Sequence, residues 1–313
     1  MATAAEWLSG ARPRTLPAAI SPVLAGSGMA VFVGAFSWWK SLLCMAVAVA
    51  IQIGCNYAND YSDGVRGSDA NRIGPLRLTG SGRARPGAVK LAAFAWFGVS
   101  CLAGLILVAA TGEWWLLAVG AASVAAAWFY TGGRHPYGYA GWGEAMVFVF
   151  FGFIACFGTA YVQGVWPPDA AALAALPGTP PGMPTSVIGA TVATACAMGC
   201  LATAILVTNN LRDIVGDAEV GKRTLATRLG DRATRWFDVG LVVAAGVAVV
   251  VAAALSTWFA LVGLLGLLLL VRPTQQVLAR ASGRELVAVL KRTGVAELAV
   301  AAGMTLGWVI DRV

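Results

Sequence analysis

Two stretches of the sequence place carboxylates and amides at the ends of long apolar segments. The first runs from Gln52 to Asp69 and reads QIGCNYANDYSDGVRGSD. Four of its polar residues recur at spacings of four, three and four, which puts them on one face of a helix: Gln52, Asn56, Asn59 and Asp63. Polar groups at bilayer depth normally face a cavity or one another. A polar seam between packed helices is the alternative, but such seams use Ser, Thr and single Asn rather than repeated Asp.

A second polar cluster follows another apolar segment, residues 187–208. Its members are Asn209, Asn210, Arg212, Asp213 and Asp217, and the basic pair Lys222 and Arg223 comes next. Asp213 and Asp217 are four residues apart, so both point the same way from one helix. Two acidic helix ends, each followed by basic residues, predict a metal-bridged diphosphate held between them. The acids would bind Mg2+, and the Arg and Lys side chains would bind phosphate oxygens.

The composition of the chain is that of a membrane protein. Of its 313 residues, 58% are hydrophobic and 12% are charged, whereas soluble domains carry about 25% charged residues. Such long apolar runs fit helices, because an outer-membrane barrel would show short alternating segments instead. The sequence therefore predicts an all-α polytopic membrane protein with nine spans, approximately 16–36, 40–58, 90–110, 114–131, 143–162, 187–208, 236–254, 257–271 and 294–310.

Basic residues are distributed asymmetrically between the predicted loops. If the N-terminus is cytoplasmic and nine spans alternate, all of the 22 basic residues except Lys40 and Arg312 fall on the cytoplasmic side. This distribution follows the positive-inside rule and places both Asp clusters on one side of the membrane. The net charge of +7 does not indicate nucleic acid as a partner, because no basic-aromatic pattern accompanies it.

The longest predicted cytoplasmic segment, about residues 60–89, is rich in Gly and Pro, which let backbone fold close to a ligand. Within it, Arg66, Arg72 and Arg77 are candidates for binding the diphosphate, and Asp69 can rejoin the first cluster if the chain turns.

The fourth predicted span ends next to Arg134, which could reach the same diphosphate. Arg12 and Arg14 precede the first span; they could contact an anionic substrate, or fix topology and bind lipid headgroups. Glu144, just inside the fifth span, needs a partner, for which a phenolic head group and a basic residue are both candidates.

These motifs resemble those of the UbiA superfamily of intramembrane aromatic prenyltransferases. That superfamily carries an N-x-x-x-D-x-x-x-D first motif and a D-x-x-x-D second motif. Asn59-x-x-x-Asp63 and Asp213-x-x-x-Asp217 match them here. The last acid of the first motif departs from the pattern, since position 67 is Gly and the next acid is Asp69.

Further matches point to one branch, the dihydroxynaphthoate prenyltransferases of menaquinone synthesis. They extend over about two thirds of the chain. The similar segments are Arg12-Pro-Arg-Thr-Leu-Pro17, Asn59-Asp-Tyr61, Gly67-Ser-Asp69, Arg72-Ile-Gly-Pro-Leu-Arg77, Tyr130-Thr-Gly-Gly133, Pro136-Tyr-Gly138 and Asn209-Asn-Leu-Arg-Asp213.

The resemblance implies nine transmembrane helices around a central cavity, in a single domain, 1–313, with cap loops at about 59–89 and 209–235. It implies transfer of a polyprenyl group from polyprenyl diphosphate to 1,4-dihydroxy-2-naphthoate, with loss of carbon dioxide and diphosphate. The product would be demethylmenaquinone. The protein would lie in the cell membrane in contact with membrane lipid, its N-terminus and active-site loops cytoplasmic.

Together, the chemistry and the resemblance give each candidate residue a role. The Mg2+ ligands would be Asp60, Asp63, Asp69, Asp213 and Asp217. The residues that bind or support the diphosphate would be Asn56, Asn59, Arg72, Arg77, Arg134, Asn209, Asn210, Lys222 and Arg223. The residues acting directly on the reaction would be Asp63, Asp213, Asp217 and Arg66.

Two rival functions fit the sequence less well. A relative that acts on 4-hydroxybenzoate, haem or chlorophyllide is disfavoured by the Asn209-Asn210 pair and the Arg72 to Arg77 run. An ion-coupled transporter predicts acids in mid-span and broken helices in both repeats. Here the acids lie at helix ends beside basic loops.

Overall fold

The structure is a computed structural model that describes residues 2–67, 76–166 and 183–313. Asp69 and Arg72 therefore lie outside the described residues. Within the described ranges all regular elements are helical. Before the first long helix come the short α1 (Ala4–Gly10) and the 3-10 turn η1 (Pro13–Thr15). A second 3-10 turn, η2 (Tyr137–Ala140), lies between the fourth and fifth spans.

Eight helical stretches in the described part are long and apolar enough to cross a membrane, and the helix α5 (Leu116–Phe129) is shorter. Six of the eight are built on single helices: α2 (Leu16–Phe32), α3 (Trp38–Arg66), α4 (Pro86–Thr111), α9 (Met183–Glu219), α10 (Leu225–Leu255) and α13 (Arg284–Ile310).

The other two spanning stretches are built from shorter pieces. One joins α6 (Gly143–Val147), the π-helical η3 (Phe148–Phe157) and α7 (Gly158–Gln163). The other joins η4 (Trp258–Gly263), α11 (Leu264–Leu267), η5 (Leu268–Leu270) and α12 (Val271–Leu278). The prediction of an all-α polytopic protein is confirmed. Its nine spans correspond to these eight stretches and α5, as far as the described residues show.

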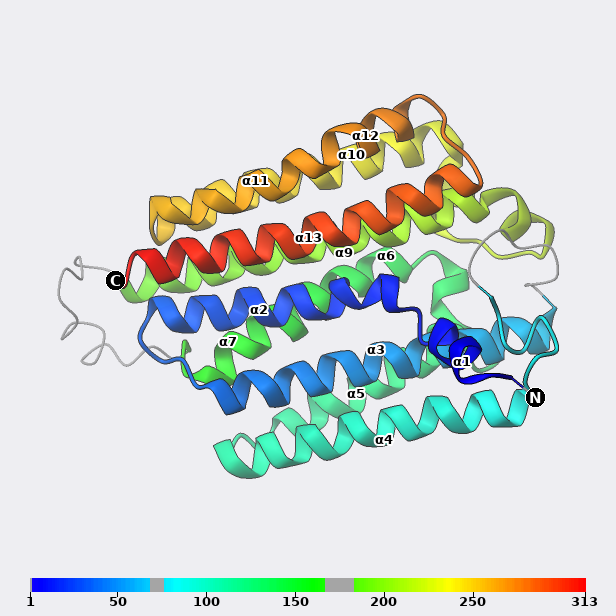
Figure 1. The fold of residues 1–313 in the computed structure, drawn as a ribbon, viewed down its shortest axis with the longest axis horizontal. Helices are drawn as coiled ribbons and strands as arrows, with labels where there is room; N and C mark the ends of the chain where they lie inside the picture. Colours follow the sequence, from blue (N-terminus) through cyan, green and yellow to red (C-terminus); the bar gives the residue numbers. More distant parts are fainter. Residues whose placement is uncertain (1, 68–75, 167–182) are drawn as a thin grey trace.

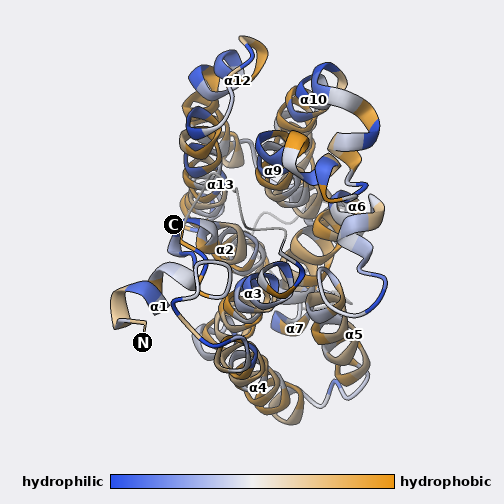
Figure 2. Ribbon diagram, turned by 90° about the vertical axis from the view of Figure 1, so that its right-hand side faces the viewer, coloured by the Kyte–Doolittle hydropathy of each residue, from blue (hydrophilic) through white to orange (hydrophobic). Residues whose placement is uncertain are grey.

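The helices lie side by side in an elongated bundle, with the N-terminus and the C-terminus at opposite ends (Figure 1). We call the end that carries α1, the end of α3 and the end of α9 the site end. Figure 2 looks onto this end, where hydrophilic residues gather on α3, α9, α10 and α12. The helix α9 packs against α10, α13 and η3. The main core forms around it, with the large buried side chains Met29, Met198, Leu201, Met304 and Trp308.

Both Asp clusters lie on helices that continue past the apolar segments. The helix α3 runs through the first cluster to Arg66 and ends at Gly67, whose φ of 74° favours glycine. The helix α9 runs through the second cluster to Glu219. Much of the segment predicted as the second cap loop is therefore helical. Thr224 caps α10, and Gly230 interrupts it with a φ of 79°.

Glycines allow the close approach of α13 to the stretch η4–α11. Gly303 and Gly307 are four residues apart on α13. A Cβ on Gly307 would overlap the carbonyl group of Phe259, and one on Gly266 would lie 2.5 Å from the backbone nitrogen of Val300. Small residues at such positions let helix backbones pack directly against each other.

The two basic residues that the sequence places on the far side lie at the end opposite the site. The Lys40 ammonium donates to the carbonyl of Val162 at 2.8 Å. The Arg312 guanidinium donates to the carbonyl of Phe32. Both cations satisfy backbone groups where helices end.

Candidate active site

A cavity of about 870 Å³ runs from the site end into the bundle, between α2, α3, α4, α5, η3 and α9. Its charged lining residues are Arg12, Asp63, Arg77, Arg212, Asp213, Asp217, Glu219 and Lys222. Most of the remaining lining is apolar and includes Val47, Leu105, Val119, Phe150 and Ile154. The expected central cavity is therefore present. The lining combines a small set of charged residues with a mostly apolar wall, which suits a ligand with an anionic head and an apolar body.

Asp63 is the acid through which the first cluster meets the rest of the site. The residue is 5% exposed. Its Oδ1 atom accepts two hydrogen bonds, one from the hydroxyl of Tyr139 and one from the Lys222 ammonium at 3.2 Å. The other oxygen lies 3.6 Å from the Arg77 guanidinium. Burial, and after it the charge of Asp63, raises the pKa of Tyr139, so this phenol remains a donor.

Lys222 joins the two Asp clusters. Its ammonium lies 3.2 Å from an oxygen of Asp63 on α3 and 3.6 Å from an oxygen of Asp217 on α9. Burial alone would lower the pKa of Lys222, but its acidic neighbours, Asp63 first, outweigh burial and raise it. The ammonium also lies 4.5 Å from the centre of the Tyr139 ring. One positive charge thus sits between carboxylates from two different helices.

The second cluster is ordered by Arg212. Its guanidinium contacts both carboxylate oxygens of Asp213, at 2.7 and 2.6 Å, and the side-chain oxygen of Asn209 at 2.9 Å. The side-chain amide of the adjacent Asn210 donates a hydrogen bond to a carboxylate oxygen of Glu144 at 2.9 Å. Asn209, Asn210 and Asp213 all line the cavity. Glu144, whose partner the sequence left open, is therefore bound to an amide rather than to a cation.

The two asparagines of the first cluster also line the cavity, and each is fixed by a neighbouring segment. The side-chain oxygen of Asn59 accepts from the Thr131 hydroxyl at 2.7 Å. The Asn56 amide donates to the carbonyl of Ala11 at 2.9 Å and to the Thr15 hydroxyl at 3.2 Å. Both side chains hold the cavity wall together as well as facing the cavity.

Four predicted site residues are absent from the described lining of this cavity. They are Asp60, Arg66, Arg134 and Arg223. The two oxygens of Asp60 accept from the backbone N–H groups of Leu78 and Thr79, at 2.8 and 2.9 Å.

Of the other three, Arg66 donates to the carbonyls of Thr131 and Gly133. Arg134 and Arg223 are exposed. These interactions indicate structural roles at the rim for Asp60 and Arg66.

Two residues that contact the acids were not assigned a role from the sequence. Tyr139 donates to Asp63, and Arg212 pairs with Asp213. Arg212 stands inside the second motif, so its position beside the first acid was a usable signal. Tyr139 lies 76 residues from Asp63 in sequence, and spacing alone gives no sign that the two side chains meet.

The donor set of the site fits a divalent cation. Carboxylates are the ligands that Mg2+ prefers in proteins, and Asp63, Asp213 and Asp217 supply them to one cavity. In the described residues, no three His, Cys, Asp or Glu side chains lie close enough together to hold a metal ion as they stand. The ammonium of Lys222 nevertheless shows that a cation is accommodated between Asp63 and Asp217.

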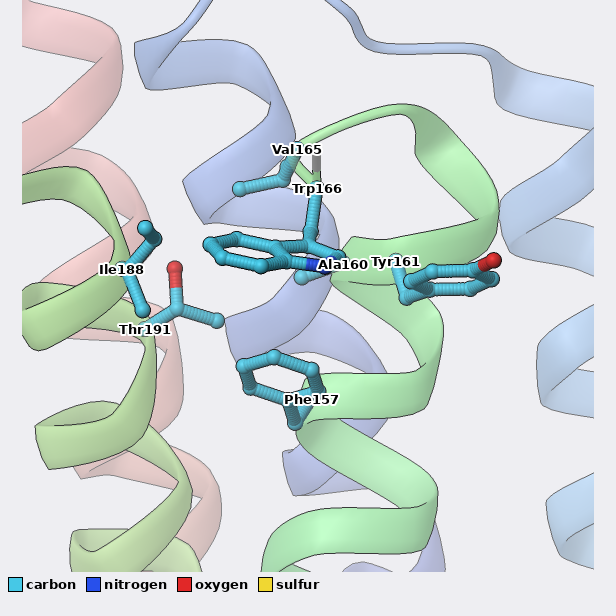
Figure 3. A pocket seen from close by; sticks show the side chains of 7 residues that line it. All are labelled: Phe157, Ala160, Tyr161, Val165, Trp166, Ile188 and Thr191. Carbon is cyan, nitrogen blue, oxygen red and sulfur yellow. The ribbon is translucent and has the colours of Figure 1, made fainter. Parts of the chain in front are cut away.

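A second, smaller hollow lies between α7 and α9, away from the acids (Figure 3). Aromatic and aliphatic side chains line it, including Phe157, Tyr161, Trp166 and Ile188. The space is too tight for a water molecule. It adds no polar site to the main cavity.

Comparison with known proteins extends the likeness to nearly the whole chain. A model described as the UbiA prenyltransferase family matches residues 19–295. A Mycobacterium tuberculosis (strain ATCC 25618 / H37Rv) protein named 1,4-dihydroxy-2-naphthoate octaprenyltransferase is 48% identical over 98% of this chain and 99% of its own length. An Escherichia coli (strain K12) protein of the same name is 37% identical over 90% of this chain and 85% of its own length.

Solved structures share the fold at lower identity. A UbiA homolog from Archaeoglobus fulgidus bound to GPP and Mg2+ superposes with a TM-score of 0.65 at 13% identity, covering 97% of this chain and 99% of that one. The apo structure of a UbiA homolog from Aeropyrum pernix K1 gives a TM-score of 0.63 at 13% identity, covering 95% and 98%. These likenesses show a common arrangement of helices.

Proposed function

Because the chain belongs to the UbiA prenyltransferase family, we propose that it transfers a polyprenyl group from polyprenyl diphosphate to 1,4-dihydroxy-2-naphthoate, with loss of carbon dioxide and diphosphate. The direct product is demethylmenaquinol, the reduced form of demethylmenaquinone, in menaquinone biosynthesis. The observation that carries the proposal is the meeting of Asp63 and Asp217 around Lys222 at the mouth of a largely apolar cavity. The relatives named for this activity support the choice of acceptor.

The charged end of the cavity would take the diphosphate of the donor. Asp63, Asp213 and Asp217 would hold Mg2+, which supplies positive charge that stabilises the departing diphosphate. Lys222 and Arg77, both beside Asp63, add fixed positive charge at the same place. Asn59 and Asn209 are positioned to support these groups. We propose no metal contact for Asp60, because both of its carboxylate oxygens accept hydrogen bonds from backbone N–H groups.

The apolar part of the cavity would hold the prenyl chain and exclude water. Breaking the bond between the allylic carbon and the diphosphate oxygen leaves both electrons on the diphosphate. The allylic cation must then meet the ring before it meets water. In net terms a carbon–carbon bond forms with electrons of the ring. The carboxylate leaves as carbon dioxide, and its bonding pair restores the aromatic ring.

The distribution of charge supports a cytoplasmic site end in the cell membrane. Of the 22 basic residues, only Lys40 and Arg312 belong to the opposite side in the predicted topology, and both lie at the opposite end of the bundle. We propose that the N-terminus and the site end face the cytoplasm. A soluble aromatic acceptor would then enter from the cytoplasm, and the hydrophobic polyprenyl donor would enter from the bilayer.

An acceptor panel tests the proposed reaction. Purified protein is given one polyprenyl diphosphate with 1,4-dihydroxy-2-naphthoate or with 4-hydroxybenzoate, in Mg2+ or in excess chelator. We expect a prenylated product from the naphthoate alone, and none in chelator. Absence of naphthoate turnover, or turnover of 4-hydroxybenzoate in its place, would reject the proposal.

Substitution of the acids tests the site itself. Asp63→Asn and Asp213→Asn each remove one charge from the cavity, and we expect each to lower turnover by roughly 100-fold or more. Both variants should still insert in the membrane, because they keep the size of the side chain. Asp311→Asn makes the same change at the exposed far end of α13. It should keep full activity, and comparable activity in all three variants would contradict the assignment.

A further inference from the structure

Arg12 has a backbone conformation that its residue type disfavours. Its φ of 53° and ψ of 66° lie in the left-handed region, which one other non-glycine residue, Arg280, enters among those described. It sits between α1 and η1, immediately before Pro13. Glycine is the usual residue for such a turn. A bulky residue held there by its surroundings is a candidate for a role of its side chain.

The turn at Arg12 is clamped by the first motif helix. Asn56 donates its amide to the carbonyl of Ala11 and to the hydroxyl of Thr15. The hydroxyl and the backbone N–H of Thr15 both donate hydrogen bonds to the carbonyl of Arg12, at 3.0 and 2.9 Å. One turn earlier, the Tyr57 hydroxyl donates to the carbonyl of Trp7 at 2.7 Å. The helix that carries Asp63 therefore also fixes the place from which the Arg12 side chain leaves the backbone.

The guanidinium of Arg12 is held in the cavity with an unfilled donor. The residue lines the main cavity, on the same wall as Thr15, Gln52 and Asn56. Its Nη2 atom is buried and has no hydrogen-bond partner among the described residues. A buried N–H donor without an acceptor is costly, which favours a ligand that supplies one. The planar fork of Arg matches a carboxylate in particular.

The turn that carries Arg12 is attached to α3 at Asn56, about two helical turns before Asp63. Asn56, which holds the Arg12 turn, precedes Asp63 by seven residues on α3, a rise of about 10 Å along the helix. Arg77 and Lys222 already contact Asp63. The proposed reaction brings together two anionic substrates, a diphosphate and an aromatic carboxylate. Besides Arg77 and Lys222 at Asp63, the cavity lining offers the guanidinium of Arg12.

Resting on the function proposed above, we propose that Arg12 binds the carboxylate of the aromatic acceptor. It forms a subsite on the α2–α3 wall that is distinct from the diphosphate cluster. Asn56 and Thr15 are positioning residues, since they set the backbone of Arg12. The subsite selects an acceptor with an acidic group beside its hydroxyl and holds its ring next to the allylic carbon.

The test compares two acceptors that differ only by the carboxylate, 1,4-dihydroxy-2-naphthoate and 1,4-dihydroxynaphthalene. Arg12→Gln and Arg12→Lys are measured against Arg14→Gln, which changes an exposed arginine outside the cavity lining. We expect Arg12→Gln to lower kcat/KM for the naphthoate at least tenfold, mainly through KM. The KM for the prenyl diphosphate should not change. Arg12→Lys should recover part of the loss, and Arg14→Gln should behave as wild type.

A binding measurement keeps the test decisive if the dihydroxynaphthalene proves a poor substrate or a variant is unstable. The thermal unfolding of each protein is followed with either acceptor and no donor. Wild type should be stabilised more by the naphthoate than by the dihydroxynaphthalene, and Arg12→Gln should abolish that difference.

Equal losses with both acceptors together with a raised KM for the prenyl diphosphate would assign Arg12 to the diphosphate and overturn the proposal. An unchanged preference for the naphthoate in Arg12→Gln would also overturn it. Failure of the proposed function is a separate result, because wild type would then neither bind nor prenylate the naphthoate.

Discussion

Lys222 is the residue on which the electrostatics of the site depend, because it is bound to acids of both clusters. Without it, Asp63 and Asp217 would face each other as like charges in a partly buried cavity. The sequence predicts Lys222 as a diphosphate ligand. Its contacts with the two acids indicate a second task, which is to hold the acids together before substrate and metal arrive.

The pKa of Lys222 gives a testable pH dependence. It is raised above its ordinary value of 10.5. A raised pKa means that the stabilisation is fully present below the unfolded-state value and is lost only as pH rises through the folded-state value. We expect Lys222→Met to lower the Tm by an amount that stays constant from about pH 6 to about pH 9. Thermal unfolding of both proteins across that range measures it.

The control for this prediction is Lys291→Met, which removes an exposed ammonium and should leave the Tm unchanged. A difference between wild type and Lys222→Met that shrinks before pH 9 would show that the ammonium is already being lost. The coupling of the two acids to Lys222 would then be wrong.

At the scale of the elements, the packing of α13 on η4–α11 depends on glycine at the crossing. We expect Gly307→Ala to destabilise the protein by about 1–3 kcal/mol, because the new Cβ would overlap backbone that cannot move cheaply. The measured Tm in detergent should fall by several degrees. Gly240→Ala is the matched control, since a Cβ there meets open space. It should leave the Tm unchanged or raise it slightly.

An unchanged Tm in Gly307→Ala would mean that the two helices are further apart than the structure has them. The sequence shows Gly303 and Gly307 one helical turn apart, which is a general sign of close helix contact. The fold determines that the partner of these two glycines is η4.

For the whole molecule, the orientation in the membrane is the property that function depends on and that helix packing alone leaves open. The helix α13 offers a direct test, because Arg284 begins it at the site end and Val313 lies just beyond its other end. Single cysteines are introduced as Arg284→Cys and Val313→Cys, and intact vesicles of known sidedness are treated with a membrane-impermeant thiol reagent.

We expect reaction of Val313→Cys from the outside, and of Arg284→Cys only after the membrane is opened. The unsubstituted protein controls for its own cysteines. The opposite pattern would place the site end outside and contradict the proposed topology.

The sequence by itself determined the class of the molecule and which helix faces carry the acids. Apolar runs long enough to cross a membrane predict helices, because a helix satisfies its own backbone hydrogen bonds in lipid. The four-residue spacing of Asp213 and Asp217 places both on one face whatever lies opposite. These are local properties of a helix, so they survive without knowledge of the fold.

The tertiary structure alone decided which polar groups remain to face the cavity, because that depends on partners from distant segments. Asp60 and Asp63 are neighbours on one helix. Asp60 is engaged by the backbone at residues 78 and 79, whereas Asp63 meets Tyr139 and Lys222. Arg66 donates to carbonyls of another segment, and Asn56 binds the backbone carbonyl of Ala11, next to Arg12. Helical periodicity gives the direction of a side chain, but only packing supplies the group that it meets.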